Sequence, residues 1–264
     1  MKTTNAEWLK ALASLKTDKQ LGKRFAEIID DLEIDLDDLE TRLGAKGSTA
    51  YDELFGSEEW SAQTPVQWLL GAMLATRVTS FVAKSETVKG NLVVKKRRLV
   101  AGDLEVTGNL ELESELFVLG TLKVGGYSLD TNDKGVAHIV VAGDVSCGTA
   151  MLSEGFLMVG GKLTAPLVTL TFNQGFAKIL GGVSAKALIE ADHGGTRIFG
   201  TLQAKALLFD ELTVDDEDRE PGEPEDLVKL LAAPAKKAIA DIDDDMEIAT
   251  KLAEHVVAGK PLFA

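Results

Sequence analysis

Three histidines and a lone cysteine are the side chains in this 264-residue sequence with the most obvious capacity for chemistry. His138, His193 and His255 lie far apart, and no spacing among them is typical of a metal site or of a Ser-His-Asp triad. His193 follows Asp192, so the pair could supply a general base, although a polar corner is the commoner role of an Asp-His-Gly-Gly stretch. The sequence therefore predicts no catalytic, cofactor-binding or metal-binding residues, and we expect the protein not to be an enzyme.

Two other stretches imitate a reactive or metal-binding site. Cys147 closes an alternating apolar run, Val-Ala-Gly-Asp-Val-Ser-Cys, which predicts a small core residue rather than a reactive thiol. The stretch from Asp130 to Gly135 imitates the start of a calcium loop, but Lys134 and Val141 stand where oxygen ligands are needed. A single cysteine cannot form an internal disulfide, and we expect a cytoplasmic protein.

Acidic residues dominate the charge of the chain: 42 Asp and Glu stand against 28 Lys and Arg, a formal net charge of −14. Residues 210–226 hold ten acids and one arginine, which predicts an exposed, mobile linker. Such a run repels itself and gains stability when something positive binds, so we predict a basic protein partner. The residues predicted to hold this partner are Asp130, Asp133, Asp215, Asp216, Glu217 and Asp218.

The same charge argues against a nucleic-acid partner, because an acidic chain repels the phosphate backbone. The short basic run from Lys95 to Arg98 is interpreted as a solvated corner that offsets nearby carboxylates. No stretch of about eighteen apolar residues is present, so we expect no membrane span or membrane partner. The first residues lack the pattern of a signal peptide.

A repeated pattern, apolar-x-Gly-x-apolar-x-apolar, runs through the middle of the chain. Its eight copies centre on Gly90, Gly102, Gly108, Gly120, Gly143, Gly161, Gly181 and Gly200. Glycines 90 and 108, 102 and 120, and 143 and 161 are each 18 residues apart, and the later steps are 20 and 19. A fixed period of this length is typical of a solenoid, and the alternation within each copy indicates short strands with one buried face.

Each coil is therefore predicted to hold three short strands around a triangular core, with six or seven coils over residues 86–209. A glycine before a strand fits a corner where the backbone turns sharply or needs a positive φ, as at Gly102 and Gly120. The longer step of 23 residues from Gly120 to Gly143 predicts a loop over residues 125–135, on a binding face. The residues predicted to point inward are Leu104, Leu122, Val145, Leu163, Val183 and Leu202.

This repeat, with its six-residue steps, resembles the bactofilins, polymer-forming bacterial cytoskeletal proteins with a right-handed β-helix. The resemblance covers about 125 of the 264 residues, in the central region alone. It implies a right-handed parallel β-helix whose open ends stack into filaments. Bactofilins have short, flexible tails, and this chain departs from that plan because long segments precede and follow the repeat.

Both flanking segments are predicted to be helical. Residues 1–78 contain an apolar seam at Phe25, Ile29, Leu32, Leu36, Leu39 and Leu43, and a helix start at Thr64-Pro65. Residues 227–264 contain a second seam with a break at Pro234. The predicted fold is therefore α+β, mainly β: a helical domain or cap over 1–78, the solenoid over 79–209, an acidic linker over 210–226 and a helical segment over 227–264. We expect the helices to cover the strand edges at the solenoid ends, which disfavours a filament.

Together these features predict a non-enzymatic protein–protein interaction module. The leading hypothesis is an acidic cytoplasmic binder, a monomer or small homo-oligomer, that neutralises one dedicated basic partner. Its broad character is similar to that of bacterial immunity proteins, which occlude cognate toxins. The alternative is a bactofilin-like scaffold that associates with itself. A third hypothesis is a solenoid enzyme such as a hexapeptide-type acyltransferase, although here the inward residues are spaced four and two apart instead of one every six.

Overall fold

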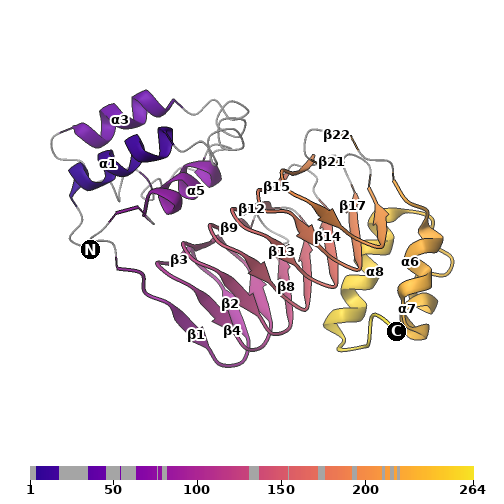
Figure 1. Cartoon of the computed structure of the whole chain (residues 1–264). Helices are drawn as coiled ribbons and strands as arrows, with labels where there is room; N and C mark the ends of the chain where they lie inside the picture. Colours follow the sequence, from indigo (N-terminus) through magenta and orange to yellow (C-terminus); the bar gives the residue numbers. More distant parts are fainter. Residues whose placement is uncertain are drawn as a thin grey trace.

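The protein is a parallel β-solenoid with helices at both termini (Figure 1). This computed structural model describes residues 4–17, 35–45, 54, 64–75, 77–78, 82–130, 137–153, 155–171, 176–191, 195–209, 212–214, 217–218 and 221–264. The chain winds past three sheets in turn, which we name sheets A, B and C, and each coil adds one strand to each sheet. The predicted mainly β fold class is confirmed.

Strands stack in chain order within each sheet. Sheet A contains β1 (Glu86–Val88), β4 (Leu104–Val106), β7 (Leu122–Val124), β10 (Val145–Ser146), β13 (Leu163–Thr164), β16 (Val183–Ser184) and β19 (Leu202–Gln203). Sheet B contains β2 (Leu92–Val94), β5 (Leu110–Leu112), β8 (Tyr127–Asp130), β11 (Thr149–Leu152), β14 (Leu167–Thr171), β17 (Ala187–Ala191) and β20 (Ala206–Leu208). Sheet C contains β3 (Arg98–Val100), β6 (Leu116–Val118), β9 (Ile139–Val141), β12 (Phe156–Val159), β15 (Phe176–Ile179), β18 (Thr196–Ile198), β21 (Leu212–Val214) and β22 (Glu217–Asp218). The first coil is β1 to β3, and the second is β4 to β6.

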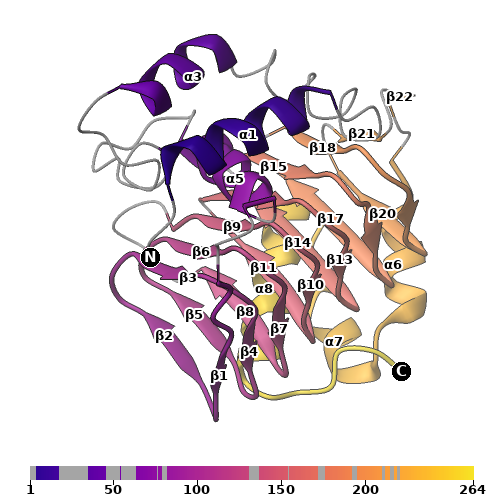
Figure 2. The same cartoon turned by 60° about the vertical axis from the view of Figure 1, so that its left-hand side comes forward.

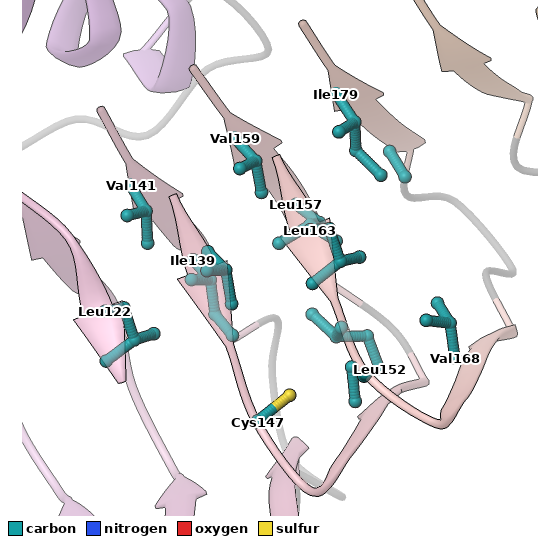
Figure 3. Packing of buried hydrophobic residues seen from close by; sticks show 14 of the residues in the cluster. Leu122, Ile139, Val141, Cys147, Leu152, Leu157, Val159, Leu163, Val168 and Ile179 are labelled. Atoms are coloured by element: carbon teal, nitrogen blue, oxygen red, sulfur yellow. The ribbon is translucent and has the colours of Figure 1, made fainter. Parts of the chain in front are cut away.

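Inward-facing side chains stack in columns that form the solenoid core (Figure 3). In sheet A, Leu104 is in register with Leu122, and Leu122 with Val145. Every residue predicted to point inward lies in this core; Leu202, in the last strand of sheet A, is half-buried and the others are buried. Successive side chains of a strand point to opposite faces, so apolar residues at alternate positions all face inward. A residue that recurs once in every coil therefore stays in one column.

Close stacking explains the glycine at the corner between sheets C and A. The N–H of Gly120 donates to the carbonyl oxygen of Gly102 at 3.0 Å. A Cβ on Gly120 would lie 2.7 Å from the carbonyl carbon of Gly102 and 2.7 Å from the nitrogen of Asp103, which is too close for any side chain. The expectation of a positive φ at Gly102 and Gly120 is not met; among the repeat glycines in the described residues, Gly90 has one, at 87°.

The sequence predicts a loop over residues 125–135, and this is wrong for its first half. Tyr127–Asp130 forms β8, which pairs with β5 and β11 in sheet B. The reason is that the longer coil keeps all three strands and carries its surplus after β8. Residues 131–136 lie outside the described part of the chain.

The N-terminal helices pack on the outer face of sheet C (Figure 2). They are α1 (Asn5–Lys16), α3 (Leu36–Gly44) and α5 (Thr64–Ala75). α5 contacts β9 and β12, and the ring of Trp68 lies 5.2 Å from that of Phe117 on β6. The helix predicted to start at Thr64-Pro65 is confirmed, as is the C-terminal part of the predicted seam, since Leu39 and Leu43 of α3 are buried. Phe25, Ile29 and Leu32 lie outside the described residues.

The C-terminal helices pack on the outer face of sheet B. They are α6 (Pro224–Leu230), α7 (Ala233–Ala238) and α8 (Asp245–Val257). The predicted break at Pro234 is found, because this proline lies in the first turn of α7 after the chain leaves α6. α8 contacts β14 and β17, and α6 contacts β20.

The expectation that helices cover the solenoid ends is therefore wrong for the described helices. Both helical groups cover side faces, where sheets B and C carry apolar residues at several outward positions. In sheet C these include Phe117, Val140 and Met158, and in sheet B they include Leu167 and Ile189. The solenoid also extends beyond the expected boundary at residue 209, since Leu212 and Val214 of β21 are buried in its core.

Candidate binding surfaces

Cys147 is part of the packed core of the solenoid. Cys147 is 7% exposed within the apolar core, and burial raises the pKa of its thiol to about 12. The thiol is thus uncharged near neutral pH and is not a nucleophile. This confirms its interpretation as a small core residue.

His138 is a buried member of an aromatic stack at the start of the strands of sheet C. Its ring lies 4.7 Å from that of Phe156, which in turn lies 4.3 Å from the ring of Phe176. The N–H of Phe156 donates to Nδ1 of His138 at 3.1 Å. Burial, with a further contribution from the charge of Arg97, lowers the pKa of His138 to about 3, so the ring is neutral at physiological pH.

Of the other two histidines, His255 is the one that the structure describes. His255 of α8 is buried, with Nε2 3.2 Å from the carbonyl oxygen of Pro261. His193 lies outside the described residues. Among the residues that are described, no cluster of three or more potential metal ligands occurs. No helix in that part of the chain has the length and apolar character to cross a membrane.

Three of the six acidic residues predicted to bind a partner lie within the described part of the chain. Asp130 is the last residue of β8, where its backbone is in register with Leu112 of β5. Glu217 and Asp218 form β22, which pairs antiparallel with β21. Asp133, Asp215 and Asp216 lie outside the described residues. The structure thus places Asp130 in sheet B and β22 at the end of sheet C, so the described members of the predicted set lie on different sheets.

Sheet A differs from the other two sheets because no described helix packs on its outer face. The outward position of each of its strands is polar, and the first three of these positions are Thr87, Glu105 and Lys123. Glu105 and Lys123 form an ion pair across adjacent coils at 2.9 Å. The outward row of sheet A, in chain order, is Thr87, Glu105, Lys123, Ser146, Thr164, Ser184 and Gln203.

The first coil ends the solenoid with a charged pair across the core. Register places Glu86 at the head of the column that continues with Leu104, and Arg98 at the head of the column that continues with Leu116. Arg98 Nη2 lies 2.6 Å from Glu86 Oε2, and both side chains are about one-third exposed, at 31% and 37%. An inward-pointing charge is one way in which proteins protect a free sheet edge. The sequence holds a signal for this pair, because Glu86 and Arg98 are the charged residues of two columns that are apolar apart from Thr196.

The opposite end is closed by the chain itself. β22 pairs antiparallel with β21 and covers the edge of sheet C. The N–H of Gly222 donates to the carbonyl oxygen of Leu207 at 2.7 Å, so the segment before α6 crosses the edge of β20. Phe209 is buried in the core at this end. The two ends of the solenoid are therefore unlike.

The basic run at residues 95–98 lies at the corner between β2 and β3 of the first coil. Lys95 Nζ is 3.7 Å from Glu113 Oε1, and Arg97 Nη2 is 3.8 Å from Glu115 Oε1, both acids being in the second coil. The guanidinium of Arg97 also lies 5.0 Å from the centre of the Trp68 ring. The interpretation as a corner that offsets nearby carboxylates is confirmed.

A cleft of about 330 Å³ separates α5 from the corner formed by Ser85, Gly102 and Asp103. The Asp103 carboxylate, which lines this cleft together with Ser85, accepts hydrogen bonds from the backbone N–H and the hydroxyl of Thr121, at 2.8 and 3.0 Å. These bonds, the backbone one first, hold the pKa of Asp103 below its usual value. Asp103 thus joins consecutive coils, and we assign the cleft no ligand.

The fold and its surfaces define the class of a helix-flanked parallel β-solenoid. No family model, curated protein or solved structure matches the chain. The stacked strands show that the central repeat is a β-helix repeat. The closer resemblance to bactofilins stays a hypothesis.

Proposed function

We propose that the protein is a non-enzymatic protein–protein interaction module that binds a basic partner protein through its acidic C-terminal portion. The observation that carries this proposal is the segregation of charge along the chain. Residues 210–264 contain 16 Asp and Glu but 6 Lys and Arg, and thus carry −10 of the formal net charge of −14. A field of one sign concentrated on one region speeds the encounter with a partner of opposite sign and selects against others.

Part of this acidic portion lies within the described residues. The turn before α8 exposes Asp241, Asp243 and Asp244, and the first turn of α8 exposes Glu247. Asp244 also caps α8, since its Oδ1 accepts the N–H of Glu247 at 2.7 Å. The remaining three carboxylates have no described structural duty that would conflict with binding a basic surface.

The test compares the wild type with a variant in which the linker acids are neutralised: Asp215→Asn, Asp216→Asn, Glu217→Gln and Asp218→Asn. Both proteins are used to capture partners from the source cells at low salt, and binding kinetics of the captured protein are then measured. We expect a basic partner whose association with the variant is slower, with little change in dissociation, and whose binding weakens as salt is added. Equal kinetics and equal salt response for both proteins would refute the role of the linker.

A self-associating scaffold is the second candidate, and the free edge of the first coil favours it. Stacking of coils requires an open edge on each contacting end, and β22 and Gly222 cover edges at the C-terminal end. Light scattering at several salt concentrations, with electron microscopy, separates the two candidates. Filaments would support the scaffold, whereas a small species of fixed mass would support the binder.

A further inference from the structure

We propose that the free edge of β2 in the first coil is a docking edge for an acidic, extended strand of a partner protein, which adds one strand to sheet B. This proposal is independent of the acidic C-terminal portion, because it concerns the opposite end of the solenoid and a partner of opposite charge. Recognition of a peptide by addition to a sheet edge combines backbone hydrogen bonds with contacts from alternate side chains.

The backbone of β2 is half used. The N–H of Leu92 donates to the carbonyl oxygen of Asn109 at 2.8 Å, and the carbonyl oxygen of Val94 accepts the N–H of Glu113 at 2.9 Å. In a pleated strand the peptide groups of alternate residues point to opposite sides. The N–H and carbonyl of Val93 therefore point away from the second coil. β2 is the terminal strand of sheet B, and no strand of the described residues pairs with this side.

The outer face beside this edge is also accessible. The side chain of Val93 is 38% exposed, and Lys89, Lys95 and Lys96 on either side of β2 are exposed. The C-terminal helices contact β14, β17 and β20, at the far end of the same sheet. An added strand would meet an apolar side chain flanked by lysines.

The charge of the first coil specifies an acidic strand. Residues 82–98 contain six Lys and Arg and one Glu, in a chain whose net charge is −14. Three of these cations, Lys95, Arg97 and Arg98, form ion pairs with Glu113, Glu115 and Glu86, and the charge available to a further strand is that of Lys84, Lys89 and Lys96. The second coil, residues 101–118, contains five acids and no Lys or Arg. It pairs with the inner edge of β2 in the register Leu92 to Leu110, Val93 to Glu111 and Val94 to Leu112. The molecule thus already shows which kind of strand this coil accepts: one in which apolar residues alternate with glutamates.

Other occupants fit less well. A nucleic acid offers no backbone amide or carbonyl groups of a strand to pair with Val93, and the overall negative charge repels it. A second copy stacked first coil to first coil would oppose two basic edges. A second copy stacked head to tail would meet β20, whose edge Gly222 already occupies. A partner protein with an acidic strand satisfies both the backbone and the charge.

The probe is a labelled peptide with the sequence of residues 108–116, GNLELESEL, which is the strand that binds the inner edge. Binding to the full chain is followed by fluorescence anisotropy at low and high salt. We expect saturable binding that weakens with salt. A control peptide carrying Glu111→Lys, Glu113→Lys and Glu115→Lys should not bind. Equal binding of both peptides, or no binding of the acidic one, would overturn the proposal.

Two variants locate the site. Val93→Pro removes the N–H that points to the free edge and leaves the hydrogen bonds of Leu92 and Val94 to the second coil intact, since proline is tolerated on an edge strand. It should weaken peptide binding about tenfold or more, whereas the matched control Val93→Thr should not. Should Val93→Pro fail to fold, Lys95→Glu with Lys96→Glu provides a second test and should weaken binding at low salt. Unchanged binding of the peptide to a folded variant would overturn the proposal. Displacement of the peptide by single-stranded DNA would also overturn it. So would self-association of the wild type that Val93→Pro abolishes.

Discussion

The two ends of the solenoid solve the same structural problem in different ways. A stack of parallel strands leaves unpaired backbone groups at its first and last coil, and such edges invite pairing with other chains. At the C-terminal end the chain turns back, with β22 antiparallel to β21 and Gly222 bonded to Leu207. At the first coil no described strand covers the edge, and a charged pair, Glu86 and Arg98, stands over the core. Among the described residues, backbone pairing covers the edges of sheets B and C at the C-terminal end, whereas the first coil has a charged pair and no covering strand.

This difference has a consequence for how each end can be used. A closed end offers its side chains to a partner, and the C-terminal portion of the sequence has an excess of acids over bases. A free end offers backbone groups as well, and here the surrounding charge is basic. The two proposals thus assign partners of opposite charge to the two ends of one fold.

The prediction with the largest expected effect compares a cavity made in the core of the second coil with one made in the first coil. Leu110 and Leu92 occupy the same column of sheet B, but Leu110 is fully buried and Leu92 is half-buried in the first coil. Leu110→Ala should lower the free energy of unfolding by about 2–5 kcal/mol, and Leu92→Ala by about 1–2 kcal/mol, because an open end can relax into the space. Urea unfolding measures both. Equal losses would mean that the first coil is packed as tightly as the second.

The second effect concerns pH. The pKa of His138 is about 3 in the folded protein, well below its value near 6.5 in the unfolded chain. Between these values the unfolded state binds the proton and the folded state does not, so stability is complete above about pH 6.5 and falls as the pH is lowered toward 3. At about pH 4.5 the loss should reach about 2–3 kcal/mol at most.

Unfolding of the wild type and of His138→Gln at several pH values tests this expectation. Glutamine keeps an acceptor for the N–H of Phe156 and does not titrate. The variant should therefore show a shallower decline between pH 6.5 and 4.5, and parallel curves would contradict the assignment. Since the charge of Arg97 contributes to the shift, Arg97→Gln should raise the pKa of His138, which links the basic first coil to the buried stack.

Much of the fold could be predicted because a few residue types recur at a fixed period. Glycines 18 to 20 residues apart, with apolar residues at alternate positions, specify a solenoid and its inward columns, and Cys147 could be placed in the core on that basis. The position of the helices could also have been predicted from the sequence. Strands such as Leu116–Val118 and Ile139–Val141 are apolar at every position and must be buried on both faces, whereas Leu104–Val106 and Leu122–Val124 carry a charged residue on the outside.

The binding surfaces were harder to predict, since a pattern of charges does not reveal which backbone groups are free. The sequence predicts that the run from Lys95 to Arg98 is a corner, and the structure confirms this. The sequence does not reveal that the corner lies in the terminal coil, because that depends on where strand pairing begins. The acids around Asp133 and Asp215 lie outside the described residues, so their role stays a prediction. Glu86 could have been noticed as a charge in an apolar column, yet its partner Arg98 becomes evident only when the two columns face each other.

A third, smaller effect compares the corners of an inner and an outer coil. Gly120 stacks directly on the backbone of Gly102 and Asp103, whereas a Cβ on Gly90 would meet nothing within 4 Å. Gly120→Asn should cost about 1–3 kcal/mol because the coils must separate. Gly90→Asn should cost less than about 1 kcal/mol, since asparagine tolerates a positive φ. Thermal unfolding compares the two, and an equally destabilised Gly90→Asn would show that the first corner is as constrained as the inner one.

The smallest effect on stability has the clearest effect on assembly. Replacing the guarding pair by Glu86→Leu with Arg98→Leu continues the apolar columns of Leu104 and Leu116 to the open end. Because both side chains are about one-third exposed, we expect the free energy of unfolding to change by less than about 1 kcal/mol. The same exposure now presents an apolar edge with free backbone groups, so the variant should associate end to end and its mass by light scattering should rise with concentration.

The matched control, Glu105→Leu with Lys123→Leu, also replaces an ion pair by two leucines, but on the outer face of sheet A where the strands are already paired on both edges. It should not associate in this way, and neither should the double variant once Val93→Pro is added. If the mass of the Glu86→Leu, Arg98→Leu variant equals that of the wild type at every concentration, the charged pair is not what prevents association at the first coil. The proposed contrast between the two ends is then wrong.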